Sequence, residues 1–80
     1  ESIRVKDEFV NIELVERALE SHPSVQESAV VGVPVEVGGE AVAAFLTPAA
    51  DAEIDPAAVR QHTASEVPEY MLPRYITVLD

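Results

Sequence analysis

The sequence contains no cysteine, which excludes disulfide bonds and thiolate metal sites and is typical of a reducing compartment. Basic residues are scarce, since 5 lysines and arginines stand against 15 acidic residues and the formal net charge is −10. A nucleic-acid-binding protein needs a basic surface, and an anionic membrane would repel this chain, so we expect neither partner. The longest apolar stretches, such as Ala41 to Leu46, are too short to span a bilayer. We therefore expect a cytoplasmic protein without a membrane span.

The sequence also lacks the patterns of a complete active site. No Ser or Thr has the spacing of a nucleophile elbow. Gly32, Gly38 and Gly39 do not form a phosphate-binding loop, which needs its glycines and a lysine between a strand and a helix, so we expect all three in turns. His22 and His62 have no acidic residue at ligand spacing on a shared helix face, which argues against a zinc site. We expect no metal site and interpret His62 as a helix-packing residue.

A few charged residues stand out by position. Glu13, Glu16 and Glu20 recur at helical spacing, which predicts a solvated helix face. Glu13 would also lie in the first turn, where the helix dipole favours a negative charge. Arg74 follows Pro73 directly, ahead of the last predicted strand. An arginine there can bind a phosphate or form a surface ion pair with one of the many acids, and the sequence leaves both open.

Apolar residues make up 48% of the 80 residues, enough for one small domain that buries roughly 60% of its unfolded surface. Their spacing predicts a definite order of helices and strands. The predicted elements are two strand pieces around a turn within Ile3 to Val10, a helix capped by Asn11 and ended by Ser21-His22-Pro23, strands over Ala29 to Val33 and Ala41 to Leu46, a helix capped by Asp55 from Pro56 to about Glu66, and a strand over Tyr75 to Leu79. Both middle strands should be largely buried, with a hairpin loop of several residues containing Pro34 between them.

This order predicts an α+β fold over residues 1–80. We expect a two-layer sandwich in which a small, mainly antiparallel sheet carries two helices on one face, plus a short N-terminal hairpin. In the first helix, Ile12, Val15, Ala18 and Leu19 recur at the spacing of a buried face. Val10 and Val15 occupy the two positions of a hydrophobic staple, which fixes the angle at which the chain enters the helix.

Three segments together resemble one known module. They are IRVKDEFVNIELVE (residues 3–16), SHPSVQESAVVGVP (residues 21–34) and EVPEYMLPRY (residues 66–75). Their order and register are similar to the C-terminal lid of adenylate-forming enzymes, a superfamily of acyl-CoA synthetases, luciferases and peptide-synthetase adenylation domains. The likeness is greatest to fatty-acid or carnitine-type CoA ligases. Arg4 stands where the family has a lysine, Asp7 stands where it has a glycine, and Glu8 matches the glutamate of a Gly-Gly-Glu-Asn loop in one branch.

The resemblance implies the mobile C-terminal domain of an ATP-dependent carboxylate–CoA ligase, an acid–thiol ligase. Such an enzyme forms an acyl-adenylate and then, after the lid rotates, an acyl-CoA thioester. ATP, Mg²⁺ and coenzyme A are implied for the full-length enzyme, bound mostly outside this chain. The implied partners are a small-molecule carboxylic acid and an N-terminal adenylating domain of the same polypeptide. The hinge is expected before Glu1 and the catalytic lysine after Asp80, so we expect no catalytic residue within the chain and no catalysis by it alone.

In that family the loop at Val5 to Val10 lines the path of the pantetheine arm during thioester formation. The implied cofactor-binding residues are therefore Lys6, Asp7, Glu8 and Phe9, together with Arg74 in the last linker. An aspartate in place of glycine adds a side chain and a charge, which Lys6 can offset, and aspartate tolerates left-handed backbone better than most residues. We interpret this departure as a sign of modified acceptor handling.

Two other interpretations stay open. The chain can be the lid of a peptide-synthetase-type adenylation domain, whose acceptor is the phosphopantetheine of a carrier protein. It can also be a free-standing α/β module that binds a partner or small ligand and catalyses nothing, because this architecture hosts many functions. The carboxylic acid is not specified by these residues, since in the family the acyl pocket belongs to the N-terminal domain.

Leu19 is predicted to lie in the core beneath the first helix. Leu19→Ala should therefore leave a cavity and lower the free energy of unfolding by ~2–5 kcal/mol. Urea-induced unfolding of the wild type and the variant measures this difference. An unchanged unfolding midpoint would place Leu19 outside the core.

Overall fold

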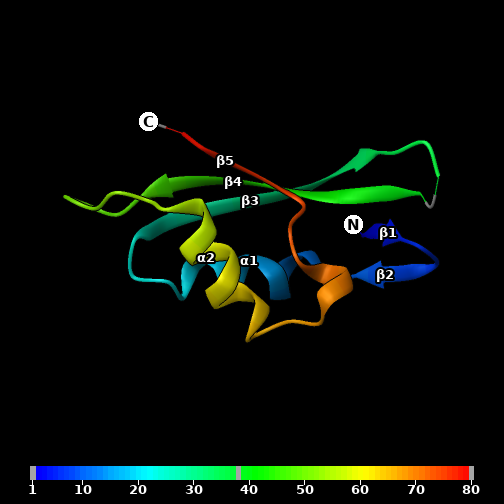
Figure 1. Ribbon diagram of the computed structural model, residues 1–80, viewed down its shortest axis with the longest axis horizontal. Coiled ribbons are helices and arrows are strands. Elements are labelled where there is room, and N and C mark those ends of the chain that lie inside the picture. Colours follow the sequence, from blue (N-terminus) through cyan, green and yellow to red (C-terminus); the bar gives the residue numbers. More distant parts are fainter. Residues whose placement is uncertain (1, 38, 80) are drawn as a thin grey trace.

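The computed structural model describes residues 2–37 and 39–79, and its helices and strands follow the predicted order (Figure 1). The elements are β1 (Ile3–Val5), β2 (Glu8–Val10), α1 (Ile12–Glu20), β3 (Val25–Pro34), β4 (Glu40–Pro48), α2 (Pro56–Ala64), the short 3₁₀ helix η1 (Glu69–Met71) and β5 (Tyr75–Val78). β1 and β2 form a two-stranded antiparallel hairpin. In the second sheet β4 is central, antiparallel to β3 and parallel to β5. Both helices lie on one face of this sheet, which confirms the α+β two-layer prediction.

The predicted helix starts are confirmed. The Asn11 side chain accepts a hydrogen bond from the Leu14 N–H at 3.1 Å, and the Asp55 side chain accepts one from the Ala57 N–H at 3.1 Å. Pro56 occupies the first turn of α2, where its missing N–H costs nothing. The predicted end of α2 near residue 66 was two residues too late, because the backbone leaves the helix after Ala64 in a tight turn. The η1 helix was not predicted.

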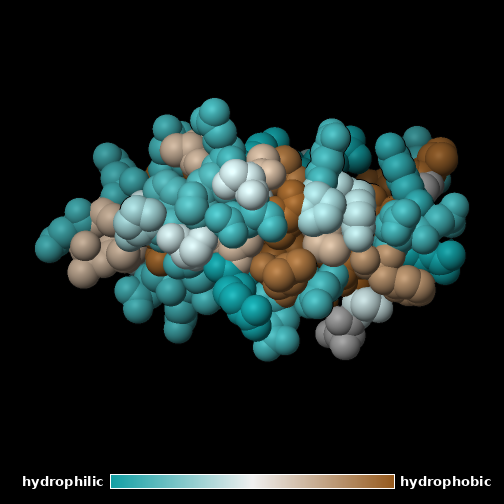
Figure 2. All heavy atoms as spheres, turned by 90° about the horizontal axis from the view of Figure 1, so that it is seen from below, coloured by the Kyte–Doolittle hydropathy of each residue, from teal (hydrophilic) through white to brown (hydrophobic). Residues whose placement is uncertain are grey.

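The core lies between the helices and the sheet. Leu19 and Val15 of α1, Val59 of α2 and Leu46 of β4 have no exposed surface, and Val10 is 1% exposed. Leu19 is therefore a core residue, as predicted, and both staple residues are buried together in one cluster. The face of the molecule that carries the helices is mostly hydrophilic, and its apolar atoms are most visible near the middle (Figure 2). No helix in the described part of the chain is long and apolar enough to cross a bilayer.

The strand β3 differs from its prediction in length and in burial. It is longer than the predicted residues 29–33, and Ala29 and Val31 are exposed. The reason is that both helices pack on one face of the sheet, so alternate residues of β3 face away from them. Gly32 was expected in a turn, but it lies within β3 opposite Val42. A Cβ atom at Gly32 would lie 2.9 Å from the Glu40 carboxylate and 3.0 Å from Ile3 Cγ2, so a larger residue there would have to displace these side chains.

Two carboxylates of α1 close the free edge of β3. The Val30 N–H donates to Glu16 Oε2 at 3.1 Å, and the Ser28 N–H donates to Glu20 Oε2 at 2.9 Å. The prediction of a solvated face is therefore wrong for Glu16, which is half-buried, whereas Glu13 and Glu20 are exposed as predicted. Unpaired N–H groups on an edge strand invite pairing with another strand. The helix satisfies these groups with its own side chains, which leaves less of the edge open.

The tip of the first hairpin has the backbone of a glycine-type turn without a glycine. Val5 pairs with Glu8, so only Lys6 and Asp7 lie in the loop. Their φ angles are 48° and 69°, and positive φ at both central residues is the mark of the type I′ turns of tight hairpins. L-residues in this region cost roughly 1–2 kcal/mol each, and aspartate and asparagine tolerate it best after glycine. The substitution noted at Asp7 has therefore kept the backbone geometry that glycine favours.

The second hairpin approaches the first through Gly39. This residue has φ = 93°, and a Cβ atom on it would lie 2.8 Å from the Arg4 carbonyl oxygen. Gly39 and Val5 form an isolated antiparallel bridge. The prediction that Gly39 lies in a turn is confirmed, while Gly38 lies outside the described residues. Pro34 ends β3 opposite Glu40, so the connecting loop begins one residue later than predicted.

Removing the Glu16 carboxylate should destabilise the chain, because the partly buried Val30 N–H would lose its acceptor. We expect Glu16→Ala to lower the free energy of unfolding by ~1–2 kcal/mol. The matched control is Glu13→Ala on the same helix, which should cost only ~0.5 kcal/mol through the helix dipole. Urea-induced unfolding measures both, and equal losses would show that Glu16 does not support the strand edge.

The left-handed backbone at Asp7 predicts a difference between two small substitutions. Asp7→Gly and Asp7→Ala both remove the carboxylate, but only glycine adopts positive φ freely. We expect Asp7→Gly to be more stable than Asp7→Ala by ~1 kcal/mol. Thermal unfolding of the two variants side by side checks this, and an Asp7→Ala variant at least as stable would contradict the strained turn.

Candidate functional site

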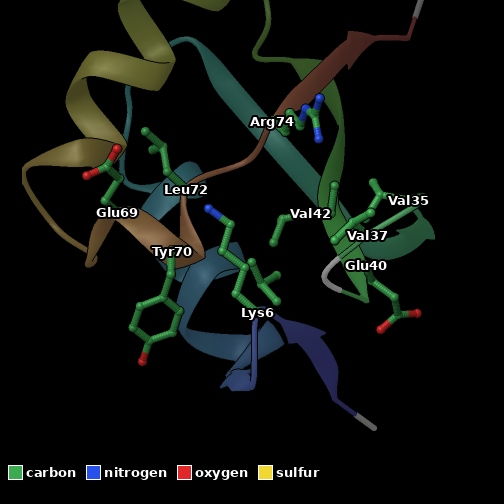
Figure 3. Close-up of a pocket in the computed structure, with 11 residues that line it drawn as sticks. Lys6, Val35, Val37, Glu40, Val42, Glu69, Tyr70, Leu72 and Arg74 are labelled. Carbon is green, nitrogen blue, oxygen red and sulfur yellow. The ribbon is translucent and has the colours of Figure 1, made fainter.

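A cavity of about 600 Å³ lies between the first hairpin, the loop before β4 and the linker from η1 to β5 (Figure 3). We call it the Lys6–Arg74 pocket, after the two cations that line it. Its apolar wall comes from three separate segments of the chain. The wall residues are Val5 of β1, Val35 and Val37 of the β3–β4 loop, Val42 of β4, and Tyr70 and Leu72 next to the last strand. Such a pocket suits a ligand that combines a carbon chain with a charged group.

The charged groups of the pocket are balanced in number. Lys6 and Arg74 supply two cations, and Glu40 and Glu69 supply two carboxylates. The Glu40 carboxylate is already engaged, because its Oε1 atom accepts a hydrogen bond from the Arg4 backbone N–H at 3.0 Å. In Figure 3 the Lys6 side chain extends from the hairpin tip into the pocket. A lysine and an arginine that line one cavity supply positive charge to which an anionic group such as a phosphate can bind.

The backbone of Arg74 is held from two sides. Its N–H donates to the Val42 carbonyl at 2.8 Å, and its own carbonyl accepts a hydrogen bond from Arg60 Nη2 at 2.7 Å. The Arg74 guanidinium lies 5.5 Å from the centroid of the Tyr75 ring. Within residues 2–37 and 39–79 it has no ion pair, so of the two predicted uses the surface ion pair is not observed. Arg60 was not predicted to take part, since nothing in its sequence position pairs it with Arg74.

The two charged residues at the hairpin tip, Lys6 and Asp7, have different neighbours. In the described part of the chain the single ion pair joins Arg4 Nη2 to Asp7 Oδ1 at 3.5 Å. Arg4 thus forms the ion pair with Asp7 while Lys6 lines the pocket, and the expectation that Lys6 offsets the Asp7 charge stays a prediction. Lys6 and Asp7 both lie in the two-residue turn with positive φ, between the strands rather than within them.

The remaining predicted site residues lie apart from the pocket lining. Asp7 and Glu8 are exposed at the tip, and Phe9 is 63% exposed. The Arg4 guanidinium lies over the Phe9 ring, 5.3 Å from its centroid. The structure thus places Lys6 and Arg74 in the lining of one pocket, while the other three predicted residues lie outside that lining and Phe9 lines a separate hollow beside the start of α1. Their role in binding stays a prediction.

The two histidines meet at the ends of the helices. The His22 and His62 rings are in edge-to-face contact with their centroids 5.2 Å apart. Ser21 Oγ donates to the Ala18 carbonyl at 2.7 Å, so its 2.7 Å hydrogen bond with His62 Nε2 has the histidine as donor. His62 is therefore a helix-packing residue, as predicted. The described residues contain no group of three or more His, Cys, Asp or Glu side chains that could hold a metal ion.

Known proteins with similar sequence or structure point to one family. The sequence model of the AMP-binding enzyme C-terminal domain matches residues 14–80. An acetyl-coenzyme A synthetase from Deinococcus radiodurans is 42% identical over 66 residues, covering 82% of this chain and 10% of that protein. Triostin synthetase I from Streptomyces triostinicus is 43% identical over 84 aligned positions, covering 96% of this chain and 16% of that protein.

Comparison with solved structures points to the same family. The crystal structure of an acyl-CoA synthetase from Brucella canis superposes with a TM-score of 0.91 at 32% identity, over 99% of this chain and 15% of that chain. The 80 residues thus span less than a fifth of the length of these relatives. The chain belongs to the AMP-binding enzyme C-terminal domain family, the C-terminal domains of adenylate-forming enzymes.

Proposed function

We propose that the chain is the mobile C-terminal domain of an ATP-dependent carboxylate–CoA ligase. The full protein would form an acyl-adenylate and pyrophosphate from a carboxylic acid and ATP, with Mg²⁺ bound alongside the triphosphate. A thiol acceptor, coenzyme A, would then attack the acyl carbonyl and release AMP. In this proposal an adenylating domain precedes residue 1, and a catalytic lysine follows residue 80.

The Lys6–Arg74 pocket is the observation that supports a CoA-type acceptor. Coenzyme A joins an extended pantetheine arm to phosphate groups, so it needs an apolar path next to cations. The pocket offers apolar side chains from three segments beside Lys6 and Arg74. These cations come from segments 68 residues apart in sequence, and the hydrogen bonds to the Arg74 backbone keep the second one in place. A water-exposed cation pair of this kind contributes mainly to binding of the acceptor rather than to the bond-forming step.

Each predicted residue takes a distinct part in this proposal. Lys6 and Arg74 bind an acceptor phosphate, and Tyr70 supplies an aromatic surface on the pocket wall. Asp7, Glu8 and Phe9 are exposed on the same hairpin outside the pocket lining, and in this proposal they contact the acceptor as it enters. ATP and Mg²⁺ are bound mostly by the rest of the protein. The chain contributes to catalysis by closing over the bound intermediate and keeping water out.

A peptide-synthetase lid is the second candidate, and the 38% identity over 66 residues to CymA of Salinispora arenicola, a probable non-canonical nonribosomal peptide synthetase, favours it. Its acceptor would be the phosphopantetheine arm of a carrier protein, which has the same apolar arm and one phosphate. The two candidates differ in whether free coenzyme A is used. A free-standing binding module that catalyses nothing is the third candidate.

The first test is acyl transfer by the full-length protein that contains this domain. ATP–pyrophosphate exchange across a panel of carboxylic acids identifies the substrate, and thioester formation is then followed with free coenzyme A and with a phosphopantetheinylated carrier protein. We expect exchange and transfer to coenzyme A. Transfer only to the carrier would support the second candidate, and absence of exchange with every acid would support the third.

Substitution of the pocket cations tests the proposed binding role. We expect Lys6→Ala and Arg74→Ala each to raise the KM for coenzyme A ~10-fold, equivalent to ~1.4 kcal/mol, because each removes a charge-assisted contact. Pyrophosphate exchange should stay unchanged, since it precedes acceptor binding. Arg17→Ala is the matched control, because Arg17 is an exposed arginine in the last turn of α1. An unchanged KM for coenzyme A in both pocket variants would show that the acceptor does not bind at this pocket.

A further inference from the structure

The hairpin tip carries a negative charge beside a pocket that, by the function proposed above, receives an anionic acceptor. Asp7 directly follows Lys6, and its side chain is 95% exposed. A free carboxylate next to Lys6 would weaken the attraction between the pocket and a phosphate, because the two charges nearly cancel at longer range. Lys6 can attract a phosphate strongly only if the Asp7 charge is compensated by another group.

Arg4 contacts two carboxylates, those of Glu40 and Asp7, by different groups. Its backbone N–H donates to Glu40 Oε1 at 3.0 Å, and its guanidinium lies 3.5 Å from Asp7 Oδ1. The guanidinium also lies over the Phe9 ring, at 5.3 Å from the centroid. Arg4 and Phe9 are paired across the hairpin, and this pairing keeps the guanidinium next to the ring. Both contacts draw the Arg4 side chain and the Asp7 carboxylate together, outside the pocket lining.

We infer that Arg4 is a positioning residue that neutralises Asp7 and so leaves Lys6 as the effective charge at the pocket entrance. It tunes the affinity for the acceptor, since a phosphate-bearing acceptor is attracted more strongly while the Asp7 charge is covered. The backbone contact to Glu40 does not depend on the Arg4 side chain. Substituting the Arg4 side chain therefore breaks the ion pair with Asp7 and leaves the hydrogen bond to Glu40 in place. The inference can thus be tested by variants of Arg4 and Asp7 alone.

A double-mutant cycle with neutral, similar-sized side chains tests this in the full-length protein. Arg4→Gln removes the covering charge and keeps most of the side-chain length, and Asp7→Asn removes the carboxylate but tolerates the left-handed backbone. We expect Arg4→Gln to raise the KM for coenzyme A about 3- to 10-fold, the size expected for one uncovered charge near a phosphate in water. Asp7→Asn alone should change it less than about 2-fold, and the double variant should return to within about 2-fold of the wild type.

Three controls separate this effect from a loss of structure. The KM for N-acetylcysteamine, a neutral thiol without phosphates, should not change in any variant. The effect on coenzyme A should shrink at about 0.5 M salt, because exposed charges are screened. Pyrophosphate exchange and the thermal unfolding midpoint should stay near their wild-type values, and Arg4→Lys, which keeps the charge, should restore most of the coenzyme A affinity.

The outcomes distinguish this inference from the function on which it rests. If the Arg4→Gln effect persists unchanged in the Asp7→Asn background, Arg4 acts by packing on Phe9 and the inference is overturned. An Arg4→Gln variant with unchanged KM overturns it as well. A wild-type protein that activates a carboxylic acid but never transfers it to coenzyme A contradicts the proposed function, and this inference falls with it.

Discussion

The close approach of β1 to the start of β4 is the contact on which the candidate site depends. It is possible because Gly39 has no side chain and accepts a φ of 93°, which lets the Arg4 carbonyl come within 2.8 Å of where a Cβ would be. The Arg4 N–H and the Glu40 carboxylate add a hydrogen bond across the same junction. Together with the burial of Ile3 and Val10 in the core, this contact fixes the first hairpin beside the sheet, where Lys6 lines a pocket with Arg74.

The scarcity of positive charge gives each cation a visible use. The chain has 5 lysines and arginines among 80 residues, and all but Arg17 lie at or beside the site. Two of them line the pocket, Arg60 holds the backbone of Arg74, and Arg4 pairs with Asp7. In a chain with a net charge of −10, such a concentration of cations marks the part of the surface suited to an anionic ligand.

Local signals in the sequence predicted the local structure well. Asn11 and Asp55 are caps because their side chains accept N–H groups that a helix start leaves free, a property of the residue and its neighbours alone. Leu19 was found by its spacing. Two failures are local, the end of α2 and the short η1 helix. Others concern contacts between distant segments: the exposure of Val31 depends on which face of the sheet receives both helices, and the use of Glu16 depends on β3 being an edge strand.

The sequence by itself determined the α+β class, the order of the elements, the helix caps and the family resemblance that the matched relatives confirm. These follow from periodicity and from short segments, whose geometry is set by neighbouring residues. Only the tertiary structure decided that Lys6 and Arg74 share a pocket, that Arg60 holds Arg74, and that Arg4 covers Asp7. Side chains on opposite sides of a tight turn, or tens of residues apart, acquire partners only when the strands pair and the layers pack. Composition and spacing carry no information on that geometry.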